Sequence, residues 1–367
     1  MSMELNVGGR METNSVSRAE FFCRRFGLRV PVLLAPMAGA CPPALSIAVA
    51  NAGGMGAAGV LLMSAQEIVA WARDVRAGTG GPFQMNAWIP GPAARRERAH
   101  EDRVRAFLAG WGPAVAPEDG DGQPPDFEAQ CEAMLAVGPR AVSSIMGMFE
   151  AAYVARLKAR GIDWFATATT VAEARQAEAA GADVVIAQGA EAGGHRGSFR
   201  AEDAEQRLVG LFSLLPCVAD AVRVPVVAAG GIADARGVAA ALALGASAVQ
   251  IGTAFLRCPE AGIPAAWAEA LGRTAPEQTA ITRAFSGRAG RSIAGAYVEA
   301  AGGAGAPAPA PYPVQRGLTA KMRAAAVREG DLQRMQAWAG QSASLARVAA
   351  AGQVVAQLWE GAREILR

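Results

Sequence analysis

Eight short apolar segments recur along the chain, and helical segments separate most of them. The apolar segments have the length of buried β-strands and cover residues 30–37, 55–61, 83–89, 141–146, 162–168, 182–188, 224–229 and 248–255. The alanine-rich segments predicted as helices cover residues 43–51, 65–76, 150–160, 171–180, 204–221 and 234–244. Continuous apolar strands are typical of a parallel sheet that is covered on both faces. The alternation therefore predicts an α/β fold, a (β/α)8 TIM barrel, with an open doubly wound sheet as the alternative.

Two long segments interrupt this alternation, at residues 93–130 and 257–315. Both are longer than ordinary barrel loops, and each follows the carboxyl end of a predicted strand, where barrel enzymes build their sites. We expect them to form a lid or substrate subdomain, with tolerated surface insertions as the alternative. The barrel then comprises residues 23–92, 131–256 and 316–367. Residues 1–22 are polar and lack periodicity, which predicts a loose N-terminal extension.

Charge and cysteine content exclude several classes of protein. The net charge is +2 and no strong cluster of Lys and Arg occurs, so no nucleic-acid partner is expected. The five cysteines show no CxxC spacing, which argues against a structural metal site or a disulfide framework and favours the reducing cytoplasm. Glu4, Arg10 and Glu12 precede any apolar run, so no signal peptide is predicted. The uncharged stretches are broken by Pro and Gly, and no membrane span is expected.

The segment AQGAEAGGHRG, residues 187–197, carries the most specific chemical signal. It follows the sixth predicted strand and places His195, one of two histidines in the chain, among closely spaced glycines. Glycine allows the backbone to approach a ligand closely, and imidazole titrates near neutral pH, as general-base catalysis requires. We therefore predict that His195 is a catalytic base, with a structural loop histidine as the alternative.

A second signal lies at the ends of the last two predicted strands. VPVVAAGGIAD ends the seventh strand at Gly230 and Gly231, and GASAVQIGTAFL ends the eighth at Gly252 and Thr253. The loops after strands seven and eight are the usual phosphate site of a barrel, because their backbone N–H groups face the ligand. The pattern predicts a phosphate cradle; tight helix–strand packing is the alternative.

Two weaker signals come from the first and third predicted strands. PVLLAPMAGA places Pro36 and Met37 at a strand end, where backbone groups and a soft side chain can meet a flat ring. Asn86 interrupts the apolar strand in FQMNAWIP, and a buried amide needs polar partners such as the edge of a heteroaromatic ring. A strand that ends at proline and an internal cap are the respective alternatives. Cys41 is expected to be a small buried residue.

Taken together, these motifs resemble the class I nitronate monooxygenases, formerly called 2-nitropropane dioxygenases. The matching strings are APM at residues 35–37, N-x-W from Asn86, QGAEAGGHRG, VVAAGGI, QIGTAF and WAGQ at residues 338–341. The resemblance runs from about Val30 to about Arg347. The Glu-Ala-Gly-Gly-His string also occurs in the flavin-dependent enoyl reductases of fatty-acid and polyketide synthesis.

The resemblance implies an FMN-dependent enzyme that oxidises alkyl nitronates, with nitroalkanes as a further substrate class, by dioxygen to a carbonyl compound and nitrite. It implies that His195 is the base and that Tyr312 lies on the substrate side. The residues implied to contact FMN are Ala35, Pro36, Met37, Asn86, Gln188, Gly193, Gly194, Gly230, Gly231, Gln250, Ile251, Gly252 and Thr253. Residues 143–147 depart from the family, which usually has an aromatic residue or histidine there, so the substrate pocket is expected to differ.

Three other interpretations stay open at this point. The chain could be an FMN- and NAD(P)H-dependent enoyl-thioester reductase on the same barrel, or a flavin-binding tailoring protein with another substrate. A phosphosugar-binding barrel without flavin is disfavoured by Asn86 and Gln188. The expected partners are a small nitro or nitronate compound and dioxygen. The sequence predicts no oligomeric state.

Overall fold

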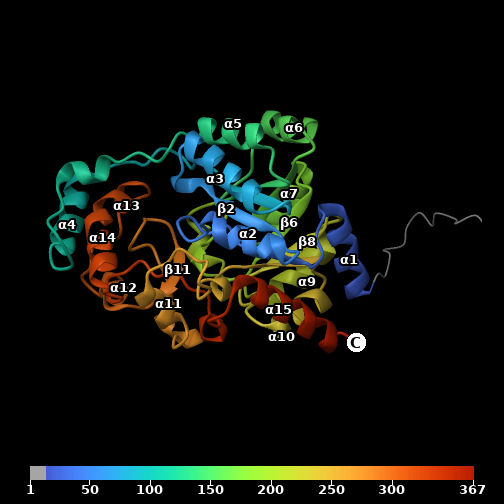
Figure 1. Cartoon of the computed structure of the whole chain (residues 1–367). Coiled ribbons are helices and arrows are strands. Elements are labelled where there is room, and N and C mark those ends of the chain that lie inside the picture. The colour runs from blue at the N-terminus through green and yellow to red at the C-terminus, as the bar shows by residue number, and fades with distance from the viewer. Residues whose placement is uncertain (1–13) are drawn as a thin grey trace, which may run out of the picture.

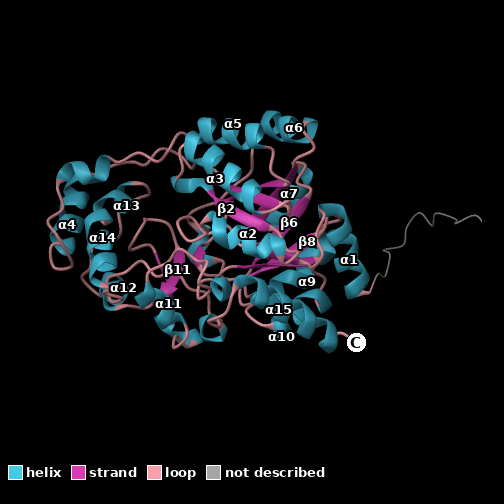
Figure 2. Ribbon diagram, viewed as in Figure 1, coloured by secondary structure: helices cyan, strands magenta, loops and turns pink. Residues whose placement is uncertain are grey.

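Eight parallel strands pair side by side and close into a barrel in this computed structural model, which describes residues 14–367 (Figure 2). The strands are β1 Val32–Leu34, β2 Gly56–Gly59, β3 Phe83–Trp88, β4 Ala141–Ile145, β5 Asp163–Ala168, β6 Val184–Gln188, β8 Val226–Ala229 and β9 Ala248–Ile251. Their order is β1-β9-β8-β6-β5-β4-β3-β2, and a parallel bridge between Leu33 and Met55 joins the two edges. Each predicted apolar segment contains one strand. The predicted (β/α)8 barrel is confirmed, and the open-sheet alternative is wrong because the edges meet.

Helices cover the outside of the barrel (Figure 1). They are α2 Pro43–Asn51, α3 Ala65–Gly78, α5 Phe127–Val137, α6 Ala151–Ala159, α7 Val171–Ala179, α9 Leu211–Ala221, α10 Ala235–Ala243 and α15 Ala351–Ile365. The single helix predicted over residues 204–221 is wrong. Helix α8 (Asp203–Gln206) is one short turn, and α9 starts afresh after Gly210, where the Glu191 carboxylate accepts a hydrogen bond from the Leu211 amide at 2.8 Å.

Helix α1, Ser15–Phe26, covers the amino-terminal end of the barrel, opposite the lid described below (Figure 1). Asn14 caps it by accepting hydrogen bonds from the amides of Val16 and Ser17. Phe22 and Phe26 are fully buried with Phe165 of β5, and the Phe26 and Phe165 rings meet edge to face at 5.1 Å. The prediction of a loose extension is therefore wrong for residues 15–22. Residues 1–13 lie outside the described part of the chain.

A second body stands over the carboxyl ends of the strands (Figure 1). Its helices are α4 Arg98–Leu108, α11 Ala265–Leu271, α12 Ala296–Ala301, α13 Val314–Leu318 and α14 Ala320–Glu329. Its antiparallel sheet has the order β10 Thr279–Thr282, β11 Gly290–Ile293 and β7 Gly194–His195. Short 3-10 helices complete the chain: η1 Val60–Leu62, η2 Pro117–Asp121, η3 Thr253–Phe255, η4 Pro276–Gln278 and η5 Ala343–Leu345.

This body has a hydrophobic core of its own. Val104 and Leu108 of α4 pack with Leu318 of α13 and Met322 of α14, so segments far apart in the chain lie side by side (Figure 1). Helix α5 instead packs on α3 of the barrel. We therefore propose to draw the subdomain, called the lid below, at residues 93–126 and 257–329. Among residues 14–367, no helix combines the length and apolar character that a bilayer span requires.

Candidate active site

A cavity of about 570 Å3 lies at the carboxyl ends of the strands, beneath the lid. Its walls include every residue proposed above to contact FMN, together with His195. These residues come from β3, from the carboxyl ends of β6 and β9, from β7, and from the loops after β1, β6, β8 and β9, so the barrel topology brings them together. Tyr312 is not part of the wall. It lies behind Trp88, with ring centroids 5.6 Å apart.

Two sets of hydrogen bonds fix the loop that carries His195. Gln188, at the end of β6, donates from Nε2 to the His195 carbonyl at 3.1 Å and accepts from the Gly197 amide at 2.8 Å. His195 then pairs with Gly290 in the antiparallel ladder between β7 and β11. Gly194 takes a φ of 74°, which favours glycine over other residues. The barrel and the lid therefore both hold the backbone of His195.

The His195 ring lies in an aromatic setting. The indole rings of Trp88 and Trp338 contact it edge on, with centroids at 4.5 and 4.7 Å. Its Nε2 is 2.8 Å from the Ser286 hydroxyl oxygen. Burial lowers the pKa of His195 from 6.5 to about 3, and the positive charges of Arg316 and Arg288 act in the same direction. The imidazole is therefore neutral at physiological pH.

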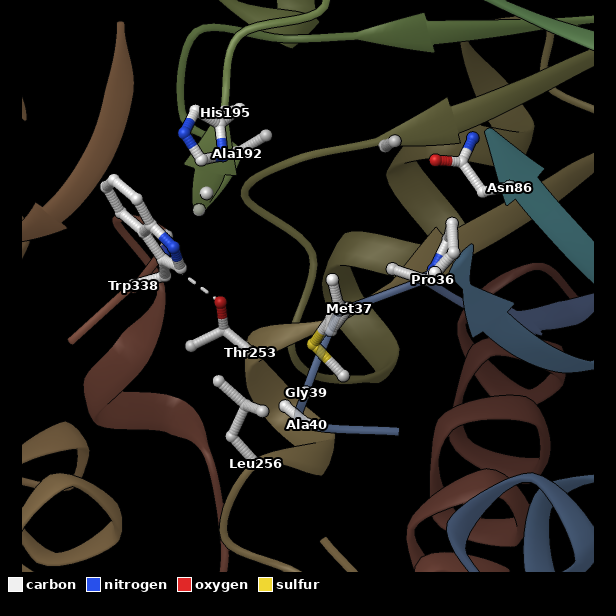
Figure 3. Close-up of a pocket in the computed structure, with 18 of the residues that line it drawn as sticks. Pro36, Met37, Gly39, Ala40, Asn86, Ala192, His195, Thr253, Leu256 and Trp338 are labelled. Carbon is white, nitrogen blue, oxygen red and sulfur yellow. Dashed lines mark hydrogen bonds between the residues drawn. The ribbon is translucent and has the colours of Figure 1, made fainter. Parts of the chain in front are cut away.

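The opposite wall contains few polar side chains. Figure 3 shows Pro36, Met37 and Asn86 facing His195 and Trp338 across the cavity. A Cβ built on Gly252 would lie 3.2 Å from the Met37 sulfur, so only glycine leaves the space open. Asn86 donates from Nδ2 to the Ser143 hydroxyl at 3.0 Å, which leaves its carbonyl oxygen without a partner among the described residues. This largely apolar wall, with one amide oxygen free to accept a hydrogen bond, has the polarity that a heteroaromatic ring requires.

The glycine-rich ends of β8 and β9 form a cradle at another part of the cavity. Gly230 and Gly231 have φ values of 107° and 70°. Within residues 14–367, the amides of Gly231 and Thr253 donate no hydrogen bond to a protein acceptor. Free backbone N–H groups at two adjacent strand ends are the donors that a phosphate needs. The cradle therefore fits the phosphate of a nucleotide-like cofactor.

The carboxyl end of β4 forms part of the wall through Ile145. Ser143 bonds Asn86, and the Ser144 hydroxyl accepts a hydrogen bond from the Trp164 indole N–H at 3.0 Å, so both serines are used inside the fold. Met146 adopts a φ of 65°, which is uncommon for a residue other than glycine. Where the resemblance leads us to expect an aromatic residue or histidine, this chain presents an apolar side chain to the cavity.

A family model described as nitronate monooxygenase matches residues 21–361. The chain belongs to the nitronate monooxygenase family. A nitronate monooxygenase of Paraburkholderia phytofirmans is 42% identical over 340 residues, which are 90% of this chain and 92% of that protein. The solved nitroalkane oxidase from Streptomyces ansochromogenes is 38% identical, with a TM-score of 0.86, and the match covers 94% of this chain and all of that one.

A weaker likeness links this member of the nitronate monooxygenase family to another group. FabK from Thermotoga maritima is 27% identical with a TM-score of 0.73, and the match covers 94% of this chain and 96% of that one. Both values are lower than those for the nitroalkane oxidase. The enoyl reductases are therefore the more distant relatives.

Sequence reasoning did not assign several residues that the nitronate monooxygenase fold places at the cavity. Trp88 and Trp338 belong to the N-x-W and WAGQ strings that carry the resemblance, but no role was predicted for either residue. Ser286, Arg316 and Arg323 had no signal at all, because lid segments distant in the chain bring them to the site. Cys41 is buried, as predicted, with its thiol 3.4 Å from the Ala35 carbonyl oxygen.

Proposed function

We propose that the protein binds FMN in this cavity and oxidises alkyl nitronates with dioxygen to a carbonyl compound and nitrite. The observation that carries the proposal is the gathering of His195, the apolar wall at Pro36 and Met37, and the glycine cradle around one cavity. Membership of the nitronate monooxygenase family supports it. The absence of CxxC spacing among the five cysteines supports a cytoplasmic location as part of this proposal.

The residues present fit FMN in three respects. Gly230, Gly231 and Thr253 would hold its phosphate through free amides, and Asn86 would contact the edge of its ring. The segment 35–37 would lie against the ring face. FMN, when bound, supplies the acceptance of electrons from the substrate and their transfer to dioxygen.

His195 acts in this proposal as a neutral imidazole. A neutral imidazole can take a proton from the α-carbon of a nitroalkane, but the low pKa of this histidine makes it a weak base. A nitronate has already lost that proton. The site therefore favours preformed nitronates, toward which His195 orients the reacting group. Trp88 and Trp338 cover the histidine and restrict the access of water to it.

The first experiment mixes the FMN-loaded protein anaerobically with ethyl nitronate, and separately with NADPH, and follows the flavin absorbance. We expect ethyl nitronate to bleach the flavin and NADPH to leave it oxidised. Rapid bleaching by NADPH alone would instead assign the protein to the enoyl reductases. Bleaching by neither reagent would indicate a flavin-binding tailoring protein with another substrate. Purified protein without a yellow flavin spectrum would contradict the cofactor assignment.

A further inference from the structure

Two arginines supply all the charge on the cavity wall. Among the described residues that line it, no side chain is acidic, and the charged ones are Arg316 of α13 and Arg323 of α14. Neither guanidinium forms a salt bridge with any residue in the range 14–367. A half-buried cation without a carboxylate partner is costly, because desolvation is not offset. The wall is therefore complementary to an anionic ligand.

The two arginines differ in their partners. Arg323 donates to the Thr319 hydroxyl, the Gln336 side-chain oxygen and the Arg316 carbonyl, at 3.2, 3.2 and 2.9 Å. All three acceptors are neutral, so these bonds hold the Arg323 side chain in place but do not neutralise its positive charge. The Arg316 side chain makes no hydrogen bond among the described residues. Its donors therefore remain available to a ligand.

Arg316 and the phosphate cradle lie on different parts of the fold, because Arg316 belongs to α13 of the lid. The positive charge of Arg316 acts on His195, which lines the cavity, and on Tyr312, which lies beside Trp88 of the wall. The cradle is formed instead by the ends of β8 and β9 in the barrel, where the Ser342 hydroxyl donates to the Gly231 carbonyl at 2.6 Å. Arg316 therefore faces the region in which the substrate would meet His195.

We propose that Arg316 binds the two oxygens of the substrate's nitronate group and selects the ionised nitronate over the neutral nitroalkane. This inference rests on the proposed function. A nitronate spreads one negative charge over two oxygens in a plane, and the planar fork of a guanidinium matches that geometry with two parallel hydrogen bonds. Arg323 is a positioning residue, because it binds the backbone carbonyl of Arg316 and adds positive charge behind it.

The test uses three variants of the flavin-loaded protein. Arg316→Gln removes the charge, and Arg316→Lys keeps the charge but removes the fork. Arg328→Gln is the matched control, because Arg328 lies on α14, is exposed and is not part of the cavity wall. Melting temperature and flavin content are measured for each variant, so that loss of folding is seen directly.

Two readouts separate anion binding from turnover. The first is the KM for ethyl nitronate compared with that for neutral nitroethane. The second is the rise in melting temperature in nitrate compared with chloride at equal ionic strength; nitrate is a planar oxyanion that resembles the nitronate group. We expect Arg316→Gln to raise the KM for ethyl nitronate about tenfold or more and to abolish the nitrate effect. Arg316→Lys should fall between wild type and Arg316→Gln, and Arg328→Gln should match wild type.

Several outcomes would overturn the inference. One is a folded, flavin-loaded Arg316→Gln variant with an unchanged KM for ethyl nitronate. Another is an equal loss with neutral nitroethane, and a third is a selective loss of NADPH binding, which would assign Arg316 to a nucleotide phosphate. The two proposals fail separately. Wild type that binds nitrate through Arg316 without oxidising nitronates contradicts the proposed function alone, and nitronate turnover indifferent to Arg316 contradicts this inference alone.

Discussion

His195 and Ser286 are joined by a 2.8 Å hydrogen bond between Nε2 and Oγ, although 91 positions of the chain separate them. The Ser286 hydroxyl also donates to the Arg288 carbonyl at 3.2 Å and accepts from the Arg288 amide at 3.3 Å. Because a serine hydroxyl has one hydrogen, the bond to Arg288 leaves Ser286 to accept from His195. This network favours the tautomer with the proton of the neutral imidazole on Nε2, and in that tautomer Nδ1 is the basic atom.

Replacement of Ser286 tests this assignment. We expect Ser286→Ala to keep its flavin but to lower kcat/KM for neutral nitroalkanes about fivefold, because one hydrogen bond of about 1 kcal/mol that fixes the tautomer is lost. Nitrogen chemical shifts of the histidine should show protonated Nε2 in wild type and a mixture of tautomers in the variant. Ser213→Ala, at an exposed position of α9, is the control. Protonated Nδ1 in wild type would contradict the assignment.

The role of His195 as a base predicts a difference between two substrate classes. His195→Asn should retain FMN and lose about 10²-fold or more of its activity on neutral nitroalkanes, because no other side chain on the cavity wall is a comparable base. Activity on nitronates should fall less, since their α-proton is already absent. Steady-state oxygen consumption with nitroethane and ethyl nitronate measures both. Equal turnover of nitroethane by variant and wild type would remove His195 from this role.

The lowered pKa of His195 also predicts a pH dependence of stability. Between its folded pKa of about 3 and the ordinary value of 6.5, the unfolded chain binds a proton that the folded chain does not. The free energy of unfolding should therefore fall as the pH decreases from about 6.5 toward 3. Urea denaturation of wild type and His195→Asn between pH 7 and pH 4.5 measures this effect, and the variant should lose less stability. Parallel curves would show that His195 titrates normally.

A close contact between Gly193, in the loop after β6, and the backbone at residues 339–340 predicts a loss of cofactor. A Cβ on Gly193 would lie 2.5 Å from the Gly340 nitrogen and 2.7 Å from the Ala339 carbonyl carbon, and both of these are backbone atoms. Gly193→Ala should force the two segments apart, destabilise the protein by about 1–3 kcal/mol and lower its flavin content. Gly122→Ala is the matched control, because its Cβ would meet nothing within 4 Å. A normal flavin spectrum in Gly193→Ala would show that the segments can shift without consequence.

Local patterns in the sequence were enough to predict the barrel but not its ends. The strands are short, buried on both faces and separated by amphipathic or alanine-rich helices, so their number and order follow from periodicity. Helix α1 was missed although Ala19, Phe22, Cys23 and Phe26 have helical spacing and Asn14 provides a cap. These four residues form a short apolar face among polar residues, and the helix is stable only because this face is buried against Phe165.

Some residues of the candidate site could be predicted from the sequence and others could not. Glycines and polar residues at strand ends were predictable, because parallel strands place their carboxyl ends together. Ser286, Arg316 and Arg323 were not predictable, because no local pattern specifies how the lid packs. That packing brings Arg316 and Arg323 to the cavity wall and Ser286 to His195. Trp88 illustrates the intermediate case, since its string matched the family but its contact with His195 required the fold.

The bridge between Leu33 and Met55 has a further consequence for how the barrel holds together. Strands β1 and β2 share few bonds, including those from the Leu34 amide to the Met55 carbonyl and from the Met55 amide to the Val32 carbonyl. The cavity wall continues from both strands, with Met37 after β1 and Gly59 at the end of β2. A bound cofactor would therefore contact residues at or after the ends of both strands and would stabilise the pairing of β1 with β2. In protein without flavin, the amides of β1 and β2 should exchange their hydrogens faster than those of the other barrel strands. Once the flavin is restored, the two groups of amides should exchange at similar rates.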